Sequence, residues 1–383
     1  EIASLSWALS VTGASGRQIQ QLQELAQEVF QRKVCVDVSG ADLASHIIGT
    51  VWALNFSHAM TDSDLEAART ALSHVAFPLD ARAGGLLTSL QPARPSAGLA
   101  SEPFVVLDSS DRLVLFKPPG WEVDYGIETV SDSERKLSMY LRALLPPRPG
   151  RWHITGDAGY TFGLLHRLDV PSSGLVLAAK TYAAYLDLRL QLNAGLIERD
   201  YIVLCHGSVP PDLTEVNAPV HWVKKSREPS AVLPKGKPSR TMLKVLAHLS
   251  LGSQDFSLVA LRIATGRQHQ IRVHMAHVGY PTVCDGKYAE GSFEVDRQWC
   301  PRNFLHRYRL AFQDRELCTR EVVMPLPDDL KIALRQLSAK GRHSAEVQHR
   351  WLRGLDLLSW EQMQTLSMSA SDDGMPLAQV KKK

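Results

Sequence analysis

Long apolar runs are missing from this chain of 383 residues. A helix that spans a membrane needs roughly 18 or more consecutive apolar residues. No stretch of the sequence approaches that length, so we predict no transmembrane helix and no membrane partner. The first residue is Glu1 rather than methionine. We therefore expect the true start, together with any targeting segment, to lie outside this sequence.

Cysteine is scarce as well. The five cysteines are odd in number and lack the short paired spacings of a zinc site or a disulfide framework; they are Cys35, Cys205, Cys284, Cys300 and Cys318. This pattern predicts no structural metal and a reducing intracellular compartment, either the cytoplasm or an organelle such as a mitochondrion or plastid. His274 and His277 lack a companion Glu or Cys at a fixed spacing, which favours surface or core residues over metal ligands.

A strong excess of one charge is also absent. The net charge of +3 is too small to indicate nucleic-acid binding by itself, but its distribution is uneven. Between Trp222 and Lys244, seven cations accompany the single acid Glu228; the cations are Lys224, Lys225, Arg227, Lys235, Lys237, Arg240 and Lys244. The stretch is either a solvated basic loop or a flexible arm that neutralises phosphates with salt-dependent affinity.

The N-terminal part of the chain has a helical pattern. Apolar residues recur at three- and four-residue intervals over Ile19–Val29 and Asp64–Val75, which predicts amphipathic helices. Trp7-Ala8-Leu9 is echoed by Trp52-Ala53-Leu54 about 45 residues later, a weak repeat similar to the Trp-Ala-Leu helical repeats of some organellar RNA-binding proteins. Two unrelated helices explain the same pattern.

After residue 101 the pattern changes to that of strands. Phe104–Leu107 and Leu113–Phe116 are apolar runs separated by a polar turn, which predicts a β-hairpin. Helices are expected over Tyr182–Asn193, with Gly195 in the left-handed cap position, and over Gln270–Val278. Further β-like runs lie at Leu175–Leu177, Tyr201–Leu204, Met242–Val245, Ser257–Ile263 and Tyr308–Phe312.

These elements predict an α+β fold, with a mixed, mainly antiparallel β-sheet core, surrounding helices and a small all-α region before it. The expected division is a helical region over 1–82, a Gly-, Pro- and Ser-rich linker over 83–101, a core domain over 102–338, and a C-terminal helical extension with a basic tail over 339–383.

One acid stands at an informative place. Asp169 follows the run His166-Arg167-Leu168 and precedes the turn sequence Val170-Pro171-Ser172-Ser173-Gly174. An aspartate before such a turn can cap it by accepting from downstream backbone amides. It can equally be a reactive carboxylate, and the segment alone fits both interpretations.

Four segments, found in the same order, resemble the motifs of the RluA-type pseudouridine synthases. They are Leu115–Gly120, His166–Asp169 with Ser173-Gly174, Glu198–Val203, and Thr265–His274 continued through Gly279–Pro281 to Asp285 and Tyr288. Leu305-His306 and Pro325–Pro327 extend the resemblance, and the long fourth motif is the most specific. The resemblance implies the pseudouridine synthase fold for residues 102–338.

The resemblance implies an isomerase that converts uridine in RNA to pseudouridine. That reaction breaks a C–N bond and forms a C–C bond without a redox step, so no cofactor or metal is expected, and the uridine must be flipped out of its stack. Asp169 corresponds to the catalytic acid, as nucleophile or base. Arg272 corresponds to the arginine that pairs with it, and Tyr201 to a tyrosine that stacks on the uracil or takes part in proton transfer.

The other candidate residues are donors for RNA phosphates: Arg167, Lys117, Arg267, His269, Lys224 and Lys225. Each also has an ordinary interpretation as a solvated charge or a turn residue. The chain departs from the family pattern at Gln268, Cys284 and Ser172, where threonine, glycine and threonine are usual. None of these is a proposed reactive group, so the departures bear on substrate choice more than on the reaction.

Two other functions stay open on the sequence. One is a catalytically silent RNA-binding protein on the same fold, and the other is a glycoside-hydrolase-like enzyme, which would need a second catalytic carboxylate. The expected partner is RNA, whether rRNA, tRNA or mRNA. We expect a monomer in which residues 1–82 add RNA contacts.

Overall fold

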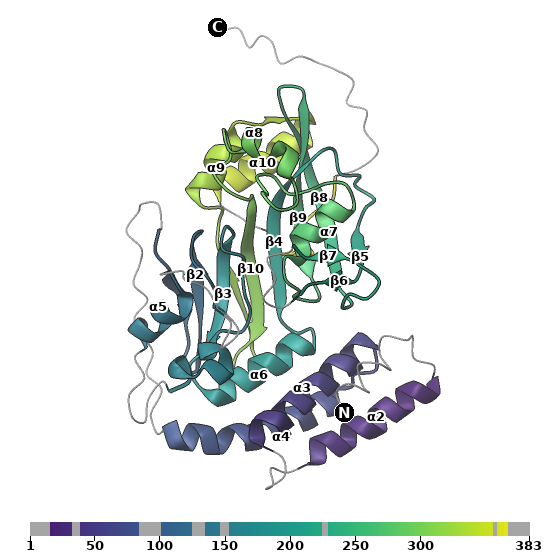
Figure 1. Ribbon diagram of the computed structural model, residues 1–383, viewed down its shortest axis with the longest axis vertical. Helices are drawn as coiled ribbons and strands as arrows, with labels where there is room; N and C mark the ends of the chain where they lie inside the picture. The colour runs from purple at the N-terminus through teal and green to yellow at the C-terminus, as the bar shows by residue number, and fades with distance from the viewer. Residues whose placement is uncertain are drawn as a thin grey trace.

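The computed structural model describes residues 16–32, 39–83, 101–124, 135–145, 153–223, 229–354 and 358–366. A ten-stranded sheet forms its centre (Figure 1), with the strand order β1-β2-β3-β10-β4-β9-β8-β12, while β11 pairs with β10 and β5 with β8. Among the described strands, β3 and β10 run parallel and the other pairings are antiparallel. The expected fold class is confirmed.

The strands of this sheet are β1 (Phe104–Asp108), β2 (Arg112–Lys117), β3 (Ser173–Ala179), β4 (Glu198–His206), β5 (Glu215–Asn217), β8 (Arg240–Leu251), β9 (Gln254–Ile263), β10 (Leu305–Gln313), β11 (Thr319–Val323) and β12 (Ser338–Ala339). A separate pair is formed by β6 (Val220–His221) and β7 (Ala231–Val232).

The described α-helices are α2 (Gly16–Gln31), α3 (Gly40–Phe56), α4 (Asp62–Ala83), α5 (Leu137–Leu144), α6 (Tyr182–Asn193), α7 (Gln270–His277), α8 (Glu290–Asp296), α9 (Asp328–Arg335) and α10 (Gly341–Arg353). Two short 3₁₀ helices are η2 (His153–Gly156) and η3 (Ala158–Gly163). None of the helices in the described ranges has the length and apolar character needed to span a bilayer.

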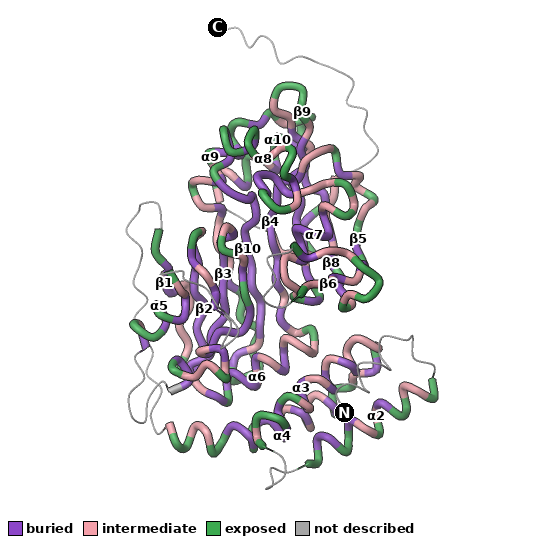
Figure 2. The backbone as a smooth tube through the Cα atoms, viewed as in Figure 1, coloured by how far each residue is buried: buried purple, intermediate pink, exposed green. Residues whose placement is uncertain are grey.

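The predicted elements are present where the sequence placed them. The first hairpin forms as β1 and β2, α6 has the predicted bounds, and α7 ends one residue before the predicted end. Gly195 has a φ of 76°, the left-handed conformation expected after α6. All residues of β2 and β3 are buried, which explains why these strands have continuous apolar runs rather than alternating ones (Figure 2).

The N-terminal helices pack against α6 at one end of the sheet (Figure 1). Both ends of α6 are bound to them: Asp80 of α4 accepts from the N–H groups of Tyr182 and Ala183 at 2.9 Å each, and Asn55 of α3 donates to the carbonyl of Asn193 at 3.1 Å. One continuous apolar core includes residues of α2, α3, α4, α6 and β10. The helical region is therefore joined to the sheet domain by packing as well as by sequence.

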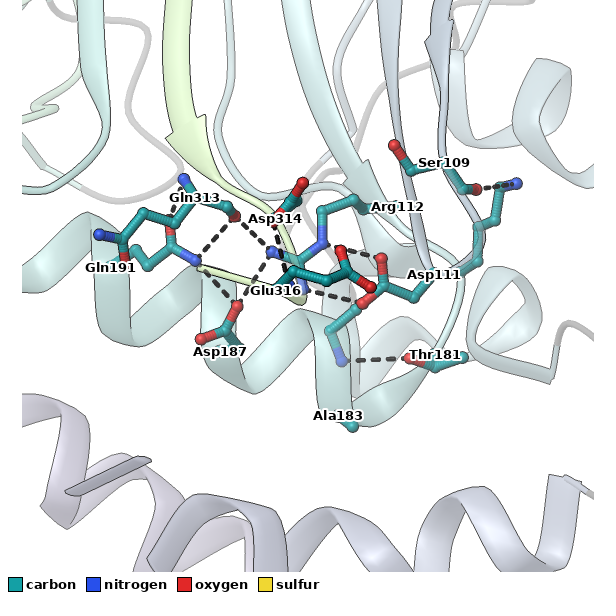
Figure 3. A network of polar contacts seen from close by, with 12 residues as sticks. Ser109, Asp111, Arg112, Thr181, Ala183, Asp187, Gln191, Gln313, Asp314 and Glu316 are labelled. Atoms are coloured by element: carbon teal, nitrogen blue, oxygen red, sulfur yellow. Dashed lines mark hydrogen bonds and ion pairs between the residues drawn. The ribbon is translucent and has the colours of Figure 1, made fainter. Parts of the chain in front are cut away.

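A buried polar network holds α6 against the sheet (Figure 3). Arg112 at the start of β2 donates to both carboxylate oxygens of Asp111, to Asp187 of α6 at 2.9 Å and to the carbonyl of Gln313 at 2.8 Å. Gln191 of α6 also donates to Asp187 and to the same carbonyl. Because each charge in the network is paired, α6 provides a fixed platform beside the site described below.

Candidate active site

Asp169 lies in the loop that joins η3 to β3. Gly163, the last residue of η3, leads into this loop with a φ of 83°, and a Cβ there would lie 2.5 Å from the carbonyl oxygen of Ala179, so only glycine fits. The main chain closes the turn after the acid, through a bond of 3.0 Å from the Ser172 N–H to the Asp169 carbonyl. The Asp169 carboxylate instead accepts from Arg272, so it does not act as a turn cap.

Arg272 lies buried in the first turn of α7. Its Nη1 donates to Oδ2 of Asp169 at 3.0 Å, while Nε and Nη2 donate to the two carboxylate oxygens of Asp285 at 2.7 and 2.6 Å. Asp285 also accepts from the N–H groups of Lys287 and Tyr288, which fixes its orientation. This bidentate pair holds the guanidinium plane toward Asp169. The expected contact between Asp169 and Arg272 is present, and Arg272 is a buried residue rather than a surface cation.

The pKa of Asp169 is lowered from its ordinary value. Burial alone would raise this pKa, but a protonated His269, the charge and hydrogen bond of Arg272, and the charge of Arg167 favour the ionised form and outweigh burial. Burial lowers the pKa of His269 to about 4, so this imidazole, whose Nε2 lies 3.9 Å from Oδ1 of Asp169, is neutral at physiological pH. Arg272 is therefore the cation that keeps Asp169 a carboxylate under those conditions.

Tyr201 projects from β4 and contacts Arg307 of β10. The Nη2 of Arg307 donates to the Tyr201 hydroxyl, and the guanidinium carbon lies 4.9 Å from the ring centroid. Arg307 is itself buried and donates from Nη1 to Nδ1 of His166 at 2.7 Å and to the Leu175 carbonyl at 2.9 Å. Tyr201 is thus a buried strand residue that also lines the cavity, with its hydroxyl oriented by a fixed cation.

Lys117 lies at the end of β2, next to the loop that carries Asp169. Its side chain is fully buried, and Nζ donates to the carbonyls of Pro118, Val170 and Ser172 at 2.9, 3.2 and 2.7 Å. Burial lowers the pKa of Lys117 to about 7. The prediction that Lys117 binds RNA phosphates is wrong, because the ammonium is enclosed by these carbonyls and is not exposed. It holds the loop instead.

The other predicted binding residues have different surroundings. Arg167 is exposed beside the cavity, whereas His269 has a left-handed φ of 53° and its Nδ1 lies 3.0 Å from the Tyr288 hydroxyl. Both line the cavity that holds Asp169. Lys224 and Lys225 lie outside the described residues.

Arg267 lies in the connection between β9 and α7. It is half-buried, donates from Nε and Nη2 to the Pro238 carbonyl at 3.3 and 3.2 Å, and lies 5.9 Å from the ring centroid of Trp52. Its guanidinium therefore lies between the sheet domain and helix α3. Burial lowers the pKa of Arg267, but an arginine remains charged at physiological pH.

The basic stretch around residues 222–244 is only partly available to a ligand. Lys244 donates to the carbonyls of Trp360 and Met363 at 2.6 and 2.8 Å, and Arg240 forms an ion pair with Glu215 at 2.7 Å. Lys237 is exposed. Lys244 and Arg240 are therefore engaged within the protein, so a single arm made of the whole stretch is not what the structure contains.

A cavity of about 270 Å³ brings the predicted reactive residues together: Asp169, Tyr201 and Arg272 all line it. The described lining contains one acid, Asp169, and six arginines, which are Arg167, Arg189, Arg199, Arg267, Arg272 and Arg307. A concave surface with this excess of positive charge attracts a polyanion. The cavity thus combines one ionised carboxylate with a setting suited to a phosphate-bearing ligand.

Metal ligation is not a feature of the described ranges, where no group of three or more His, Cys, Asp or Glu side chains could hold an ion. His274, once a possible ligand, is fully buried. Its Nδ1 lies 2.9 Å from the Thr241 hydroxyl and its Nε2 lies 2.9 Å from the Ala218 carbonyl. Both ring nitrogens are engaged, so His274 is a core residue.

Comparison with known proteins agrees with this geometry. Residues 153–277 match the family model described as RNA pseudouridylate synthase. The chain is 36% identical over 182 residues to an uncharacterised RNA pseudouridine synthase of Chloroflexus aurantiacus, covering 47% of this chain and 55% of that protein. It is 32% identical over 238 residues to ribosomal large subunit pseudouridine synthase D of Buchnera aphidicola, covering 59% of this chain and 71% of that protein.

This chain belongs to the RNA pseudouridylate synthase family. The resemblance to its RluA-type members is confirmed. The chain spans about half the length of the Chloroflexus relative. Among solved structures, human RNA pseudouridylate synthase domain containing 1 aligns with a TM-score of 0.49 and 24% identity, covering 68% of this chain and 98% of that one.

Among the residues that line this family member's cavity, Arg307 and Trp52 were not placed there by the sequence patterns. Arg307 lies in β10, where every residue except the last is buried, and its charge is satisfied there by hydrogen bonds rather than by water. Trp52 comes from helix α3, more than a hundred residues before Asp169 in the sequence. No spacing rule links these two residues, so only the fold reveals that they line one cavity.

Proposed function

We propose that this chain isomerises uridine in RNA to pseudouridine in the cavity lined by Asp169, Tyr201 and Arg272. In this reaction the C1′–N1 bond breaks, the base turns, and a C1′–C5 bond forms, while C5 loses a proton and N1 gains one. The atoms balance without an oxidant or a second substrate. Asp169 acts as nucleophile or base, and the uridine is flipped from its stack to reach it.

The observation that carries the proposal is the ion pair between Asp169 and Arg272 inside an arginine-lined cavity. A reactive carboxylate must be ionised, and the pair lowers its pKa. Tyr201 lines the cavity, and its ring is the aromatic surface proposed to stack on the uracil. Its oriented hydroxyl is also a candidate for proton transfer.

The glycosidase alternative lacks support because two acids of the motif segments, Asp285 and Glu198, are both engaged with arginines. Asp285 is 1% exposed, and both of its oxygens accept from Arg272. Glu198 pairs with Arg262 and Arg309 on β9 and β10. A retaining or inverting glycosidase needs a second carboxylate that is free to meet its substrate. Neither acid meets that need.

The class of RNA is a finer proposal. Several relatives are named as ribosomal large subunit pseudouridine synthases, and we propose ribosomal RNA as the first substrate to examine, with transfer RNA and messenger RNA as alternatives. We further propose a monomer in a reducing compartment, the cytoplasm or an organelle. We also propose that the N-terminal helices add RNA contacts.

The test is pseudouridine mapping on total RNA incubated with wild type, Asp169→Asn and Asp212→Asn. Asp212 is an exposed acid outside the cavity and serves as a matched control. We expect the wild type and the control to modify a defined set of uridines, and Asp169→Asn to be slower by about 100-fold to 10,000-fold or more. Binding of RNA by the wild type without formation of pseudouridine would favour the silent RNA-binding protein.

A further inference from the structure

A second cavity of about 500 Å³ adjoins the candidate active site. Four residues line both cavities, namely Trp52, Arg189, Asn193 and Arg267. The two spaces are therefore neighbouring parts of one cleft. We call the second space the α3 groove; its remaining lining residues are Ala41, Ala44, Ser45, Ile48, Gly49, Gly159, Tyr160, Thr161, Tyr185, Leu186 and Lys237.

The α3 groove lies between the N-terminal helices and the sheet domain. One wall is a single face of α3, where lining residues recur at three- and four-residue intervals up to Trp52. The opposite wall comes from η3 and from α6, on which Tyr185, Arg189 and Asn193 succeed one another at intervals of four. Figure 1 shows α3 running beside α6. The groove therefore exists only because the two regions are packed together.

The charge of the groove is positive. Arg189, Lys237 and Arg267 line it, and no Asp or Glu is among its described lining residues. Lys237 is exposed, and its ammonium lies 5.2 Å from the ring centroid of Trp222. A described lining with this positive charge, continuous with an arginine-lined cavity, suits a phosphate backbone that extends from one space into the other.

Trp52 stands at the junction of the two spaces. It is half-buried, stacks against Phe56 with ring centroids 5.0 Å apart, and lies beside the Arg267 guanidinium. An aromatic face among cations is the combination that proteins use to bind single-stranded nucleic acid, because each base can stack while its phosphate is neutralised. A protein partner would not require this pairing of a stacking surface with a lining whose described charged residues are all cations.

The groove is already formed before any ligand binds. The bond from Asn55 to the Asn193 carbonyl joins α3 to the end of α6, and Arg69 of α4 pairs with Asp187 of α6 at 3.3 Å. The apolar core continues beneath these contacts. A surface held in this way loses little conformational freedom on binding, which favours affinity.

We propose that the α3 groove binds the nucleotide next to the reacting uridine, with its base stacked on Trp52 and its phosphates contacted by Arg189, Lys237 and Arg267. The proposal rests on the proposed function for the identity of the ligand as RNA. It adds a subsite that the sheet domain cannot form alone. Substrate choice then depends on a helix that lies outside the four motifs of the family.

The experiment measures binding of a fluorescent 12-nucleotide oligouridine to the full chain over a range of salt concentrations. Trp52→Ala should weaken binding by about 5-fold to 150-fold, the range expected for the loss of one stacked base. Trp52→Phe should retain most of the affinity because it keeps an aromatic face. Lys237→Gln should reduce the slope of log affinity against log salt by about 0.7, the value for one phosphate contact on a single strand.

Arg335→Gln is the charge-matched control, because Arg335 is exposed on α9 at the far end of the molecule from α3. It should leave both affinity and slope as in the wild type, and thermal unfolding confirms that each variant is folded. The subsite is contradicted if Trp52→Ala and Lys237→Gln bind the oligomer like the wild type, or if Trp52→Phe loses as much affinity as Trp52→Ala. Losses as predicted in a protein that forms no pseudouridine would contradict the proposed function and leave the subsite standing.

Discussion

The ionised state of the Asp169 carboxylate depends on Arg272, and the guanidinium of Arg272 is itself held in place by Asp285. Arg272 uses two of its nitrogens on Asp285 and a third on Asp169, so its planar guanidinium bridges the two acids. A lysine carries the same charge on a flexible stem and cannot make this fork of bonds. These bonds therefore determine both the protonation state of Asp169 and the position of the Arg272 guanidinium beside it.

Removing the cation should move the acid limb of the pH–rate profile. In the folded protein Arg272 favours the Asp169 anion, so activity persists as the pH falls until the lowered pKa is reached. Without Arg272, burial is no longer outweighed, the pKa rises, and the limb should move to higher pH by about 1 to 3 units. Arg272→Gln/Asp285→Asn is the variant to use, because Asp285 then loses its charge together with its arginine partner, and Asp169 is the one carboxylate of the pair that loses its cation.

The measurement is single-turnover pseudouridine formation from about pH 4 to pH 9. The midpoint of the acid limb, rather than the rate itself, reports on the ion pair, since loss of substrate contacts lowers the rate at every pH. Asp285→Asn alone keeps the cation beside Asp169 and serves as the control. An acid limb that stays at its wild-type position in the double variant would show that Arg272 does not set the ionisation of Asp169.

Sequence motifs identified the residues that line the cavity, but they did not predict which contacts surround each side chain. Asp169, Tyr201 and Arg272 were identified because they lie in motifs with a specific order and spacing. Lys117 was misjudged because a lysine at a strand end is usually solvated, whereas here three main-chain carbonyls converge on its ammonium. Every residue has a main-chain carbonyl, and only the fold decides which of them converge on one side chain. These contacts of Lys117 therefore cannot be predicted from side-chain types.

Helix α6 shows the same limit among the elements. Its bounds follow from its own apolar pattern and from Gly195, which ends it. What covers it could not be predicted, because α4 meets it across about a hundred residues of sequence through the side chain of Asp80. Long-range packing of this kind depends on complementary surfaces, and a single sequence does not display them.

Asp80 should stabilise the joint between α4 and α6. Its carboxylate accepts from two N–H groups in the first turn of α6, where the helix dipole favours a negative charge. Asp80→Ala should lower the free energy of unfolding by about 1 kcal/mol, the usual cost of losing such a cap. Urea denaturation measures this, with Glu66→Ala, an exposed acid on the same helix, as the control. Equal midpoints for the two variants would rule out the capping role.

The whole molecule has a core that crosses its expected domain boundary. Buried Leu22, Ile47 and Leu72 of the N-terminal helices share one apolar cluster with Tyr185 of α6 and Phe312 of β10. At the other end of the sheet, Val347 and Trp351 of α10 pack into a cluster that includes residues of β4, β8 and β9. The division into regions is visible in the sequence, but the packing between them is not, because the linker separates residues that the fold brings together.

A chain shortened to residues 101–383 should therefore fold poorly rather than simply bind RNA less well. Each large apolar side chain that is uncovered forfeits about 1.5 to 3 kcal/mol of burial, and a few such losses approach the roughly 5 to 15 kcal/mol that stabilises a typical domain. We expect a lower soluble yield, a thermal transition at lower temperature and increased binding of a hydrophobic dye.

Leu186→Lys in the shortened chain should restore part of the solubility, because Leu186 lines the face of α6 that α3 covers. A shortened chain with the wild-type thermal transition would show that the shared core contributes little, and only then would deletion be a fair test of RNA contacts by the N-terminal helices.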